Sequence, residues 1–228
     1  MGVAYNSRIV TDGLVLCLDA GNSKSYPGSG TTWYDLSGTG NSGTLENGVG
    51  YSGSNLGSLV FDGVNDYIIF PNFDGFTGGD NPFSFSFWFY SDASASDNPE
   101  APFFYGNETT GQAIRIRLNN NGVITSGHWG GSGYDWNTNS GAWTLSAWNC
   151  LAETYDGTTD RLYINGLEVG NSNINNLSIP TSSNLILGKR PSGEIYGGQI
   201  SQVSIYNRAL TAQEIQQNFN ATKSRYFS

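Results

Sequence analysis

Two consecutive hairpin patterns in the third quarter of the chain constrain the fold more than any other feature. Apolar and aromatic residues at 149–155 and 161–164 flank the turn sequence 156–159. The second strand ends at Asn165-Gly166, the dipeptide most typical of a two-residue hairpin, and the chain then returns into 167–169. The segment therefore predicts antiparallel strands joined by tight turns.

Similar short patterns recur along most of the sequence. In residues 83–90, Phe alternates with Ser, so that Phe83, Phe85, Phe87 and Phe89 are expected on one face of a strand. Further strands are expected at 14–19, 33–36, 43–45, 58–61, 67–70, 113–118, 123–125, 143–145, 185–188 and 199–206. The 31 glycines and the 14% aromatic content suit short strands and tight turns. We expect an all-β, two-sheet antiparallel jelly-roll sandwich.

One short C-terminal helix is expected after Leu210. Thr211 and Glu214 have the spacing of a capping box, and Ile215 and Phe219 would lie on one face. A helix of about three turns cannot form a layer, so we expect it to plug the sandwich edge. With 228 residues the chain fits one domain, which we place at 13–228 after a polar N-terminal arm at 1–12.

Charge and hydropathy exclude several classes of partner. The net charge of −9 repels phosphate backbones and anionic lipid, so nucleic-acid binding is not expected. No apolar run approaches the roughly 20 residues of a membrane span, and the N-terminus lacks the pattern of a signal peptide. The cysteines, Cys17 and Cys150, are expected in different strands and favoured as free thiols, but the sequence leaves their pairing open.

Four segments together resemble one fold family. Residues 61–68, 148–168, 185–190 and 197–215 are similar, in order, to segments of laminin-G-like, concanavalin A-like jelly rolls. The resemblance covers about residues 12–220. It implies a non-enzymatic module for adhesion, decoration or carbohydrate contact, although a fold alone does not establish a function.

The opening segment, residues 7–38, resembles laminin-G-like virion structural proteins of tailed phages, of the kind found in cyanophages. This resemblance implies a protein of the virion surface that is assembled in the host cytoplasm. Its expected partners are other capsid or tail proteins, further copies of itself, and host-surface glycan. The alternative function is a carbohydrate-binding lectin module, and a remote alternative is a glycan hydrolase.

Acidic residues near position 64 are candidates for a calcium site. Asp62, Asn65 and Asp66 offer three oxygen ligands within five residues, and the wider fold often carries one Ca²⁺ on a sheet rim. Additional ligands are expected from Asp19, Asp35 or Asp156. The competing interpretation is that these side chains only close turns through backbone N–H groups.

A glycine-rich loop after residue 125 is the candidate ligand site. Aromatic faces cover sugar C–H groups, and carboxylates and amides bind hydroxyls. The residues concerned are Trp129, Tyr134, Asp135, Trp136 and Asn137. The same side chains would serve a protein interface, or would anchor the loop by packing inward.

Catalytic patterns are weak. His128 is the single histidine, and no G-x-S-x-G motif accompanies it. The paired-carboxylate run E-x-D-x-x-E of related glycan hydrolases is absent, and Glu153 and Asp156 straddle a turn. We therefore expect that the protein is not an enzyme.

Overall fold

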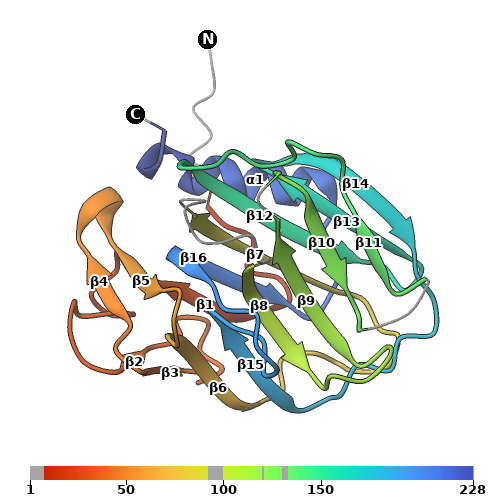
Figure 1. The fold of residues 1–228 in the computed structure, drawn as a ribbon, viewed down its shortest axis with the longest axis horizontal. Helices are drawn as coiled ribbons and strands as arrows, with labels where there is room; N and C mark the ends of the chain where they lie inside the picture. The colour runs from red at the N-terminus through yellow and green to blue at the C-terminus, as the bar shows by residue number, and fades with distance from the viewer. Residues whose placement is uncertain (1–7, 92–99, 120, 130–132, 228) are drawn as a thin grey trace.

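Two antiparallel sheets stack face to face, as the jelly-roll prediction requires (Figure 1). The computed structural model describes residues 8–91, 100–119, 121–129 and 133–227. Sheet A contains, in order, β14 (Leu167–Asn173), β13 (Thr159–Ile164), β12 (Trp148–Tyr155), β7 (Phe83–Tyr90), β16 (Gly197–Tyr206), β5 (Ser58–Asp62) and β4 (Gly50–Ser52), with β1 (Leu14–Asp19) also paired to β16. Sheet B contains β11 (Asp135–Asn137), β10 (Ile124–Gly127), β9 (Ala113–Leu118), β8 (Glu100–Gly106), β15 (Ser183–Leu187), β6 (Tyr67–Phe73), β3 (Gly43–Glu46) and β2 (Thr32–Trp33).

The core between the sheets is built on strand alternation. Phe83, Phe85, Phe87 and Phe89 of β7 all point inward, as the period of two predicts. Phe85 stacks on Phe103 of β8 with ring centroids 4.1 Å apart and planes 4° from parallel. Burying a phenylalanine side chain contributes about 2–3 kcal/mol, so this aromatic layer joins the two sheets.

Local patterns located most strands but not all. The predicted bounds of β1, β7 and β9 agree with the structure, whereas the strand expected at 143–145 is wrong. Trp143 there is buried against Phe89, and the Asn149 side chain hydrogen-bonds the backbone of Thr144, so this segment is an anchored loop. The patterns did not indicate β4, β8 or β11. These strands are short, polar or contain proline, and they form because neighbouring strands pair with them.

The turn at residues 62–66 does not close a hairpin, contrary to what the flanking strand patterns suggest. β5 before it belongs to sheet A, and β6 after it belongs to sheet B. The turn therefore carries the chain from one layer of the sandwich to the other.

The predicted helix is α1 (Ala212–Thr222), and it begins with the predicted capping box of Thr211 and Glu214. Its position differs from the prediction, because Ile215 packs against Ala152 and Tyr163. These two residues lie on the outer face of sheet A, so α1 covers that face and does not plug an edge (Figure 1). Two short 3₁₀ helices, η1 (Ser54–Leu56) and η2 (Lys223–Arg225), complete the described helical structure.

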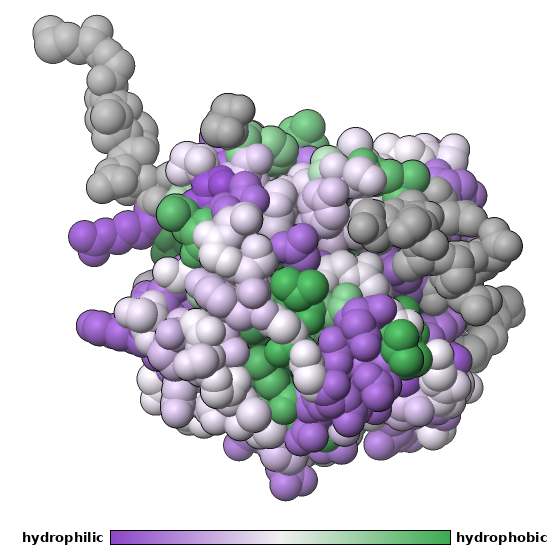
Figure 2. Space-filling view, turned by 60° about the vertical axis from the view of Figure 1, so that its left-hand side comes forward, coloured by the Kyte–Doolittle hydropathy of each residue, from purple (hydrophilic) through white to green (hydrophobic). Residues whose placement is uncertain are grey.

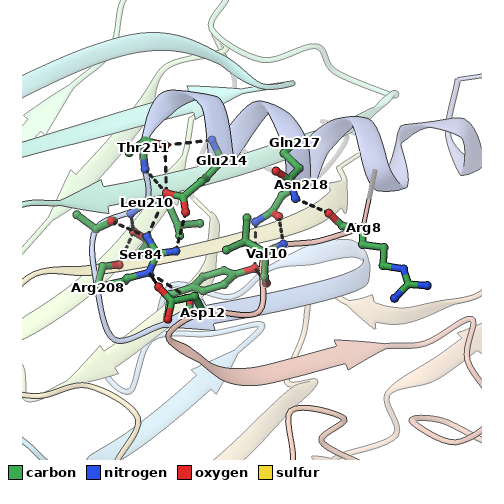
Figure 3. A network of polar contacts seen from close by, with 12 residues as sticks. Arg8, Val10, Asp12, Ser84, Arg208, Leu210, Thr211, Glu214, Gln217 and Asn218 are labelled. Atoms are coloured by element: carbon green, nitrogen blue, oxygen red, sulfur yellow. Dashed lines mark hydrogen bonds and ion pairs between the residues drawn. The ribbon is translucent and has the colours of Figure 1, made fainter. Parts of the chain in front are cut away.

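The described part of the N-terminal arm lies along α1 (Figure 3). The backbone N–H of Val10 donates to Asn218 Oδ1 at 2.8 Å, and the carbonyl of Val10 accepts from the Tyr206 hydroxyl at 3.0 Å. Gln217 Nε2 donates to the Arg8 carbonyl at 2.8 Å. Residues 1–7 of the predicted arm lie outside the described residues, and the division into an arm and a domain stays a prediction.

Cys17 and Cys150 are free thiols, as favoured from the sequence. They lie on β1 and β12, which β16 and β7 separate in sheet A. In the described residues, no helix is both long and apolar enough to cross a bilayer. On the side of the molecule shown in Figure 2, apolar side chains form small groups bordered by hydrophilic ones.

Candidate functional site

The structure separates the residues of the predicted ligand loop into two groups. Asp135 and Asn137 of β11 face outward, where they contact Arg115 and Thr125. Trp136 between them points into the sandwich, because neighbouring strand residues face opposite sides. Tyr134 also packs against the main core. The predicted cluster of three aromatic side chains is therefore not one surface, and 130–132 lie outside the described residues.

Trp129 lies on the outer face of sheet B. It packs beside Phe104, Ala113 and Ile186, whose side chains project from β8, β9 and β15 on that face. The guanidinium carbons of Arg115 and Arg190 lie 5.5 and 4.8 Å from the centre of its ring. Two cation–π contacts hold the partly exposed indole in one orientation, and a fixed aromatic surface of this kind loses little entropy when a ligand stacks on it.

Ion pairs surround Trp129 on the same face. Arg115 Nη2 lies 2.9 Å from Asp135 Oδ2, and Arg117 Nε lies 2.9 Å from Glu194 Oε1. Arg190 Nε lies 3.5 Å from Glu194. The side chains are only partly exposed, from 5% for Arg115 to 31% for Asp135. These arginines and carboxylates form a polar surface that connects β9 and β11 to the loop after β15.

Part of this polar surface has unused hydrogen-bonding capacity. Arg115 Nε and Asp135 Oδ1 are both buried without a hydrogen-bond partner among the described residues. Burial lowers the pKa of Arg115, and the Asp135 carboxylate opposes that shift. Buried polar groups that lack partners are uncommon in native structures.

A second aromatic and cationic contact extends this surface toward β6. Lys189 Nζ lies 3.4 Å from the centre of the Tyr67 ring. Tyr67 and Ile69 pack in the same apolar cluster as Trp129. We call the surface formed by Tyr67, Arg115, Trp129, Asp135 and Arg190 the sheet B face.

The proposed calcium residues close a turn. Asp62 Oδ1 accepts from the backbone N–H groups of Val64 at 2.8 Å and Asn65 at 3.2 Å. Both bonds lower the pKa of Asp62, and the bond from Val64 contributes most. Asp66 Oδ2 accepts from Asp62 N at 3.0 Å, and burial raises the pKa of Asp66. A calcium ion at this turn stays a prediction.

The three residues expected to supply additional calcium ligands have other partners in the structure. Asp19 pairs with Arg225 at 2.9 Å, and Asp156 pairs with Arg161 at 2.6 Å. Asp35 accepts from the backbone N–H of Cys17 at 2.9 Å. Each carboxylate fixes its own loop, so the described contacts do not bring them to Asp62.

A polar cluster that the sequence did not predict lies between the sheets. Asp160 Oδ2 accepts from Ser126 Oγ at 2.7 Å and Trp136 Nε1 at 2.8 Å, and His128 Nε2 lies 3.2 Å away. Glu153 projects into the same interior, and Ser126, His128, Glu153 and Asp160 are fully buried. The position of Asp160 could have been predicted from strand alternation, because residues 160, 162 and 164 share the inward face of β13.

Glu153 does not pair with Asp156, as expected from the turn between them. Asp156 lies at the surface beside Arg161, whereas Glu153 is enclosed. Burial raises the pKa of Glu153 well above its usual value, and the Asp160 charge adds to this shift. The nearby Ser126 hydroxyl opposes it. A carboxyl group shut away from solvent cannot reach the glycosidic bond of a bound glycan.

A cavity of about 210 Å³ lies on the other side of the molecule, between α1 and sheet A. Both thiols line it, together with Trp88, Asn218 and Thr222. Burial raises the pKa of Cys17 to about 11 and that of Cys150 to about 12. A raised pKa disfavours the reactive thiolate form at neutral pH, and the cavity is remote from the sheet B face.

Residues 62–216 match the family model described as the concanavalin A-like lectin/glucanases superfamily. The chain belongs to this superfamily. The match begins at the turn between β5 and β6 and ends within α1, so it includes every residue of the sheet B face. No curated protein matches the chain in sequence.

Three solved structures have a fold similar to the one described. Domain 4 of AbnA, a GH43 extracellular arabinanase from Geobacillus stearothermophilus in complex with arabinotriose, is 19% identical with a TM-score of 0.66, covering 90% of this chain and 97% of that one. The botulinum neurotoxin serotype D binding domain is 16% identical, with a TM-score of 0.70 and coverage of 92% and 52%. Trypanosoma rangeli sialidase in complex with 2,3-difluorosialic acid is 19% identical, with a TM-score of 0.70 and coverage of 95% and 34%. The chain thus corresponds to about a third of the sialidase and half of the toxin domain, and these similarities show the fold.

Proposed function

We propose that this protein is a non-enzymatic module that binds carbohydrate on the sheet B face. The observation that carries the proposal is Trp129, a partly exposed indole in cation–π contact with Arg115 and Arg190. Sugar rings stack on such a surface, and arginine and carboxylate groups beside it bind hydroxyls. The arabinotriose complex of AbnA domain 4 supports the proposal, because that domain covers nearly the same length in the same fold.

A binding function without chemistry is supported by the arrangement of the carboxylates. Asp135 of the sheet B face and Glu194 beside it are each paired with arginine. Among the described residues, Glu153 has a strongly raised pKa, but its carboxyl group is enclosed in the core. A glycan hydrolase needs one carboxyl group that donates a proton and a second one on the other side of the same bond. Asp135 and Glu194 instead hold arginine side chains, which supports binding over catalysis.

Titration calorimetry with defined oligosaccharides tests the proposal. The panel contains arabinotriose, a neutral glucan oligosaccharide and a sialylated trisaccharide, so that neutral and acidic sugars are distinguished. We expect Trp129→Ala to weaken binding at least tenfold, which corresponds to about 1.4 kcal/mol. Tyr34→Ala is the matched control, because Tyr34 is an exposed aromatic residue at 49% exposure outside this face. Equal binding by both variants and the natural chain would contradict the proposal.

The virion role belongs to the same proposal. The resemblance of residues 7–38 to tailed-phage structural proteins supports a surface position on a capsid or tail, where the sheet B face would contact host glycan or neighbouring proteins. Quantitative mass spectrometry of purified virions is the test. A stoichiometric amount that survives a density gradient is expected, and its loss during purification would remove the virion role while leaving carbohydrate binding intact.

A further inference from the structure

Four fully buried polar side chains meet between the sheets, away from the sheet B face. Ser126 and His128 come from β10 and the residues after it in sheet B, and Glu153 and Asp160 come from β12 and β13 in sheet A. Isolated charges in a protein interior are costly unless they are paired, neutralised by a proton or bound to a metal. Two carboxyl groups side by side in an aromatic core therefore need a partner.

The orientation of His128 directs one ring nitrogen toward the Asp160 carboxylate. Its Nδ1 lies 3.0 Å from the Ala113 carbonyl oxygen. A carbonyl oxygen only accepts hydrogen bonds, so Nδ1 carries the proton and donates it. This leaves Nε2 directed at Asp160, 3.2 Å from Oδ2. A backbone carbonyl that holds Nδ1–H is a common support for a histidine that binds metal through Nε2.

Glu153 provides the second and independent observation. It is completely buried, and neither of its oxygens has a hydrogen-bond partner among the described residues, because the nearby Ser126 hydroxyl donates its single proton to Asp160 Oδ2. Asp160 Oδ1 likewise lacks one within the described part of the chain. One ligand atom each from His128, Glu153 and Asp160 lies within 4.8 Å of the other two. Unpartnered oxygens from two strands thus lie close to a ring nitrogen whose described contact is Asp160 Oδ2.

The distances suit a small transition-metal ion. Ligand atoms about 2.0 Å from a tetrahedral zinc ion are separated from one another by about 3.3 Å. His128 Nε2 lies 3.2 Å from Asp160 Oδ2, a distance that a direct hydrogen bond between them also gives, and Asp160 Oδ1 on the same carboxylate is the oxygen left for a metal. Calcium and magnesium prefer oxygen ligands only, whereas imidazole with carboxylates suits zinc and related metals. The donor set therefore selects the class of metal.

We propose that His128, Glu153 and Asp160 bind one divalent transition-metal ion, with zinc as the favoured species, as a structural link between the two sheets. The ion would neutralise both carboxylates and connect β12 and β13 to the end of β10. Because the ligands are enclosed, the metal enters during folding and takes no part in ligand binding. The proposal is independent of carbohydrate binding on the sheet B face.

The competing arrangement is a proton held by Glu153 with no metal. Glu153→Gln distinguishes the two, because the amide has the shape of a protonated carboxyl group but is a poor metal ligand. Without metal, this variant should be as stable as the natural chain or more stable. With metal, the natural chain alone should gain stability.

The experiment is refolding of tag-free protein from denaturant and chelator, with or without one equivalent of Zn²⁺, followed by gel filtration. Bound metal is measured by mass spectrometry and stability by the thermal midpoint. We expect one Zn²⁺ per chain and a midpoint raised by about 5–10 °C at a free metal concentration near 100 times Kd. Glu153→Gln should hold less than a tenth of an equivalent, whereas the remote control Glu168→Gln, at an exposed carboxyl group of β14, should hold a full one.

Cobalt spectroscopy of the natural chain keeps the proposal testable if Glu153→Gln does not fold. Four- or five-coordinate Co²⁺ with histidine and carboxylate ligands should give visible absorption bands that one equivalent of Zn²⁺ abolishes. The proposal is overturned if the natural chain refolded with Zn²⁺ or Co²⁺ holds no metal and shows no midpoint shift. It is also overturned if Glu153→Gln binds a full equivalent.

Discussion

At the scale of single residues, the sheet B face depends on how arginine holds Trp129. Trp129 has a backbone φ of 68°, in the left-handed region that a bulky residue rarely adopts. Such a conformation costs about 1–3 kcal/mol and persists only when its surroundings fix it. The guanidinium groups of Arg115 and Arg190 supply contacts that fix the ring. The strained backbone and the cation–π contacts therefore act together to present the indole.

Replacing Arg115 with lysine tests this arrangement while keeping the charge. Arg115 contacts both Asp135 and Trp129, and an ammonium group cannot maintain the planar contacts of a guanidinium. We expect Arg115→Lys to weaken oligosaccharide binding about tenfold, or about 1.4 kcal/mol, as measured by calorimetry. Arg161→Lys, at the surface ion pair with Asp156, is the control and should bind normally. Unchanged affinity in Arg115→Lys would separate Arg115 from the binding site.

Gly106 and Gly30 form a matched pair for testing backbone constraints. Both have positive φ, 101° and 96°, but a Cβ at Gly106 would lie 2.1 Å from the Gln112 carbonyl oxygen, whereas nothing lies within 4 Å at Gly30. We expect Gly30→Ala to cost about 1 kcal/mol from conformation alone. Gly106→Ala should cost at least about 3 kcal/mol, because the end of β8 must move. Denaturant unfolding measures both, and equal losses would show that the β8 end relaxes freely.

At the scale of elements, the start of α1 is held by charge. The Glu214 carboxylate lies 2.6 Å from Arg208 Nη2 and accepts from the backbone N–H of Thr211 at 2.8 Å. The hydrogen bond from Arg208, followed by those from Thr211, lowers the pKa of Glu214 from its ordinary 4.5 to about 2, while burial opposes this shift. The ionised group therefore stabilises the fold above pH 4.5, and this contribution is lost as the pH falls from 4.5 toward 2.

We expect this loss to appear as a difference between the natural chain and Glu214→Gln. At pH 6 the variant should be less stable by about 1 kcal/mol, a value reduced for solvent screening of a partly exposed pair. The difference should close near pH 2. Thermal unfolding at both pH values measures it, and a gap that does not depend on pH would show that the carboxylate charge is not what stabilises the helix start.

The sequence predicted strands, turns and the helix start correctly where residues close together in the chain determine them. The alternation of β9, the Asn165-Gly166 turn and the Thr211 capping box all form as expected. The strands on either side of the turn at 62–66 were predicted, but their pairing was not, because the local pattern is the same whether the next strand pairs with the first or crosses to the other sheet. Pairing of distant strands decides that choice.

At the scale of the whole molecule, the sandwich keeps both thiols apart and unreactive. β16 and β7 separate the strands that carry Cys17 and Cys150. Burial, followed by the charges of Asp19 and Asp35, raises the pKa of Cys17 to about 11, and burial raises that of Cys150 to about 12. At pH 8, therefore, about a thousandth or less of either group is thiolate.

Thiol titration tests this account of the whole fold. We expect no reaction of the native protein with a disulfide reagent over minutes at pH 8, and two reactive thiols per chain in denaturant. The thermal midpoint should be the same with and without reductant. Absence of free thiols in the denatured chain would reveal a disulfide and contradict the strand order of sheet A.

The candidate site could be predicted only in part, because it is assembled from distant segments. The aromatic content around Trp129 and Trp136 was visible, but their opposite orientations follow from the position of β11 in sheet B. Arg115, Arg190 and Tyr67 reach the sheet B face from β9, the loop after β15, and β6. A single sequence does not say which strands will be neighbours, so these partners appeared only in the structure.

Nuclear magnetic resonance titration of the labelled chain with the oligosaccharides described above tests the central claim most directly. The chain contains six tryptophans, so their indole N–H signals report on separate regions. We predict saturable shifts of the Trp129 indole and of the β9 amides, with the signals of Trp88 and Trp148 on sheet A unchanged. Shifts confined to sheet A and α1, or no saturable shift with any sugar of the panel, would contradict carbohydrate binding on the sheet B face.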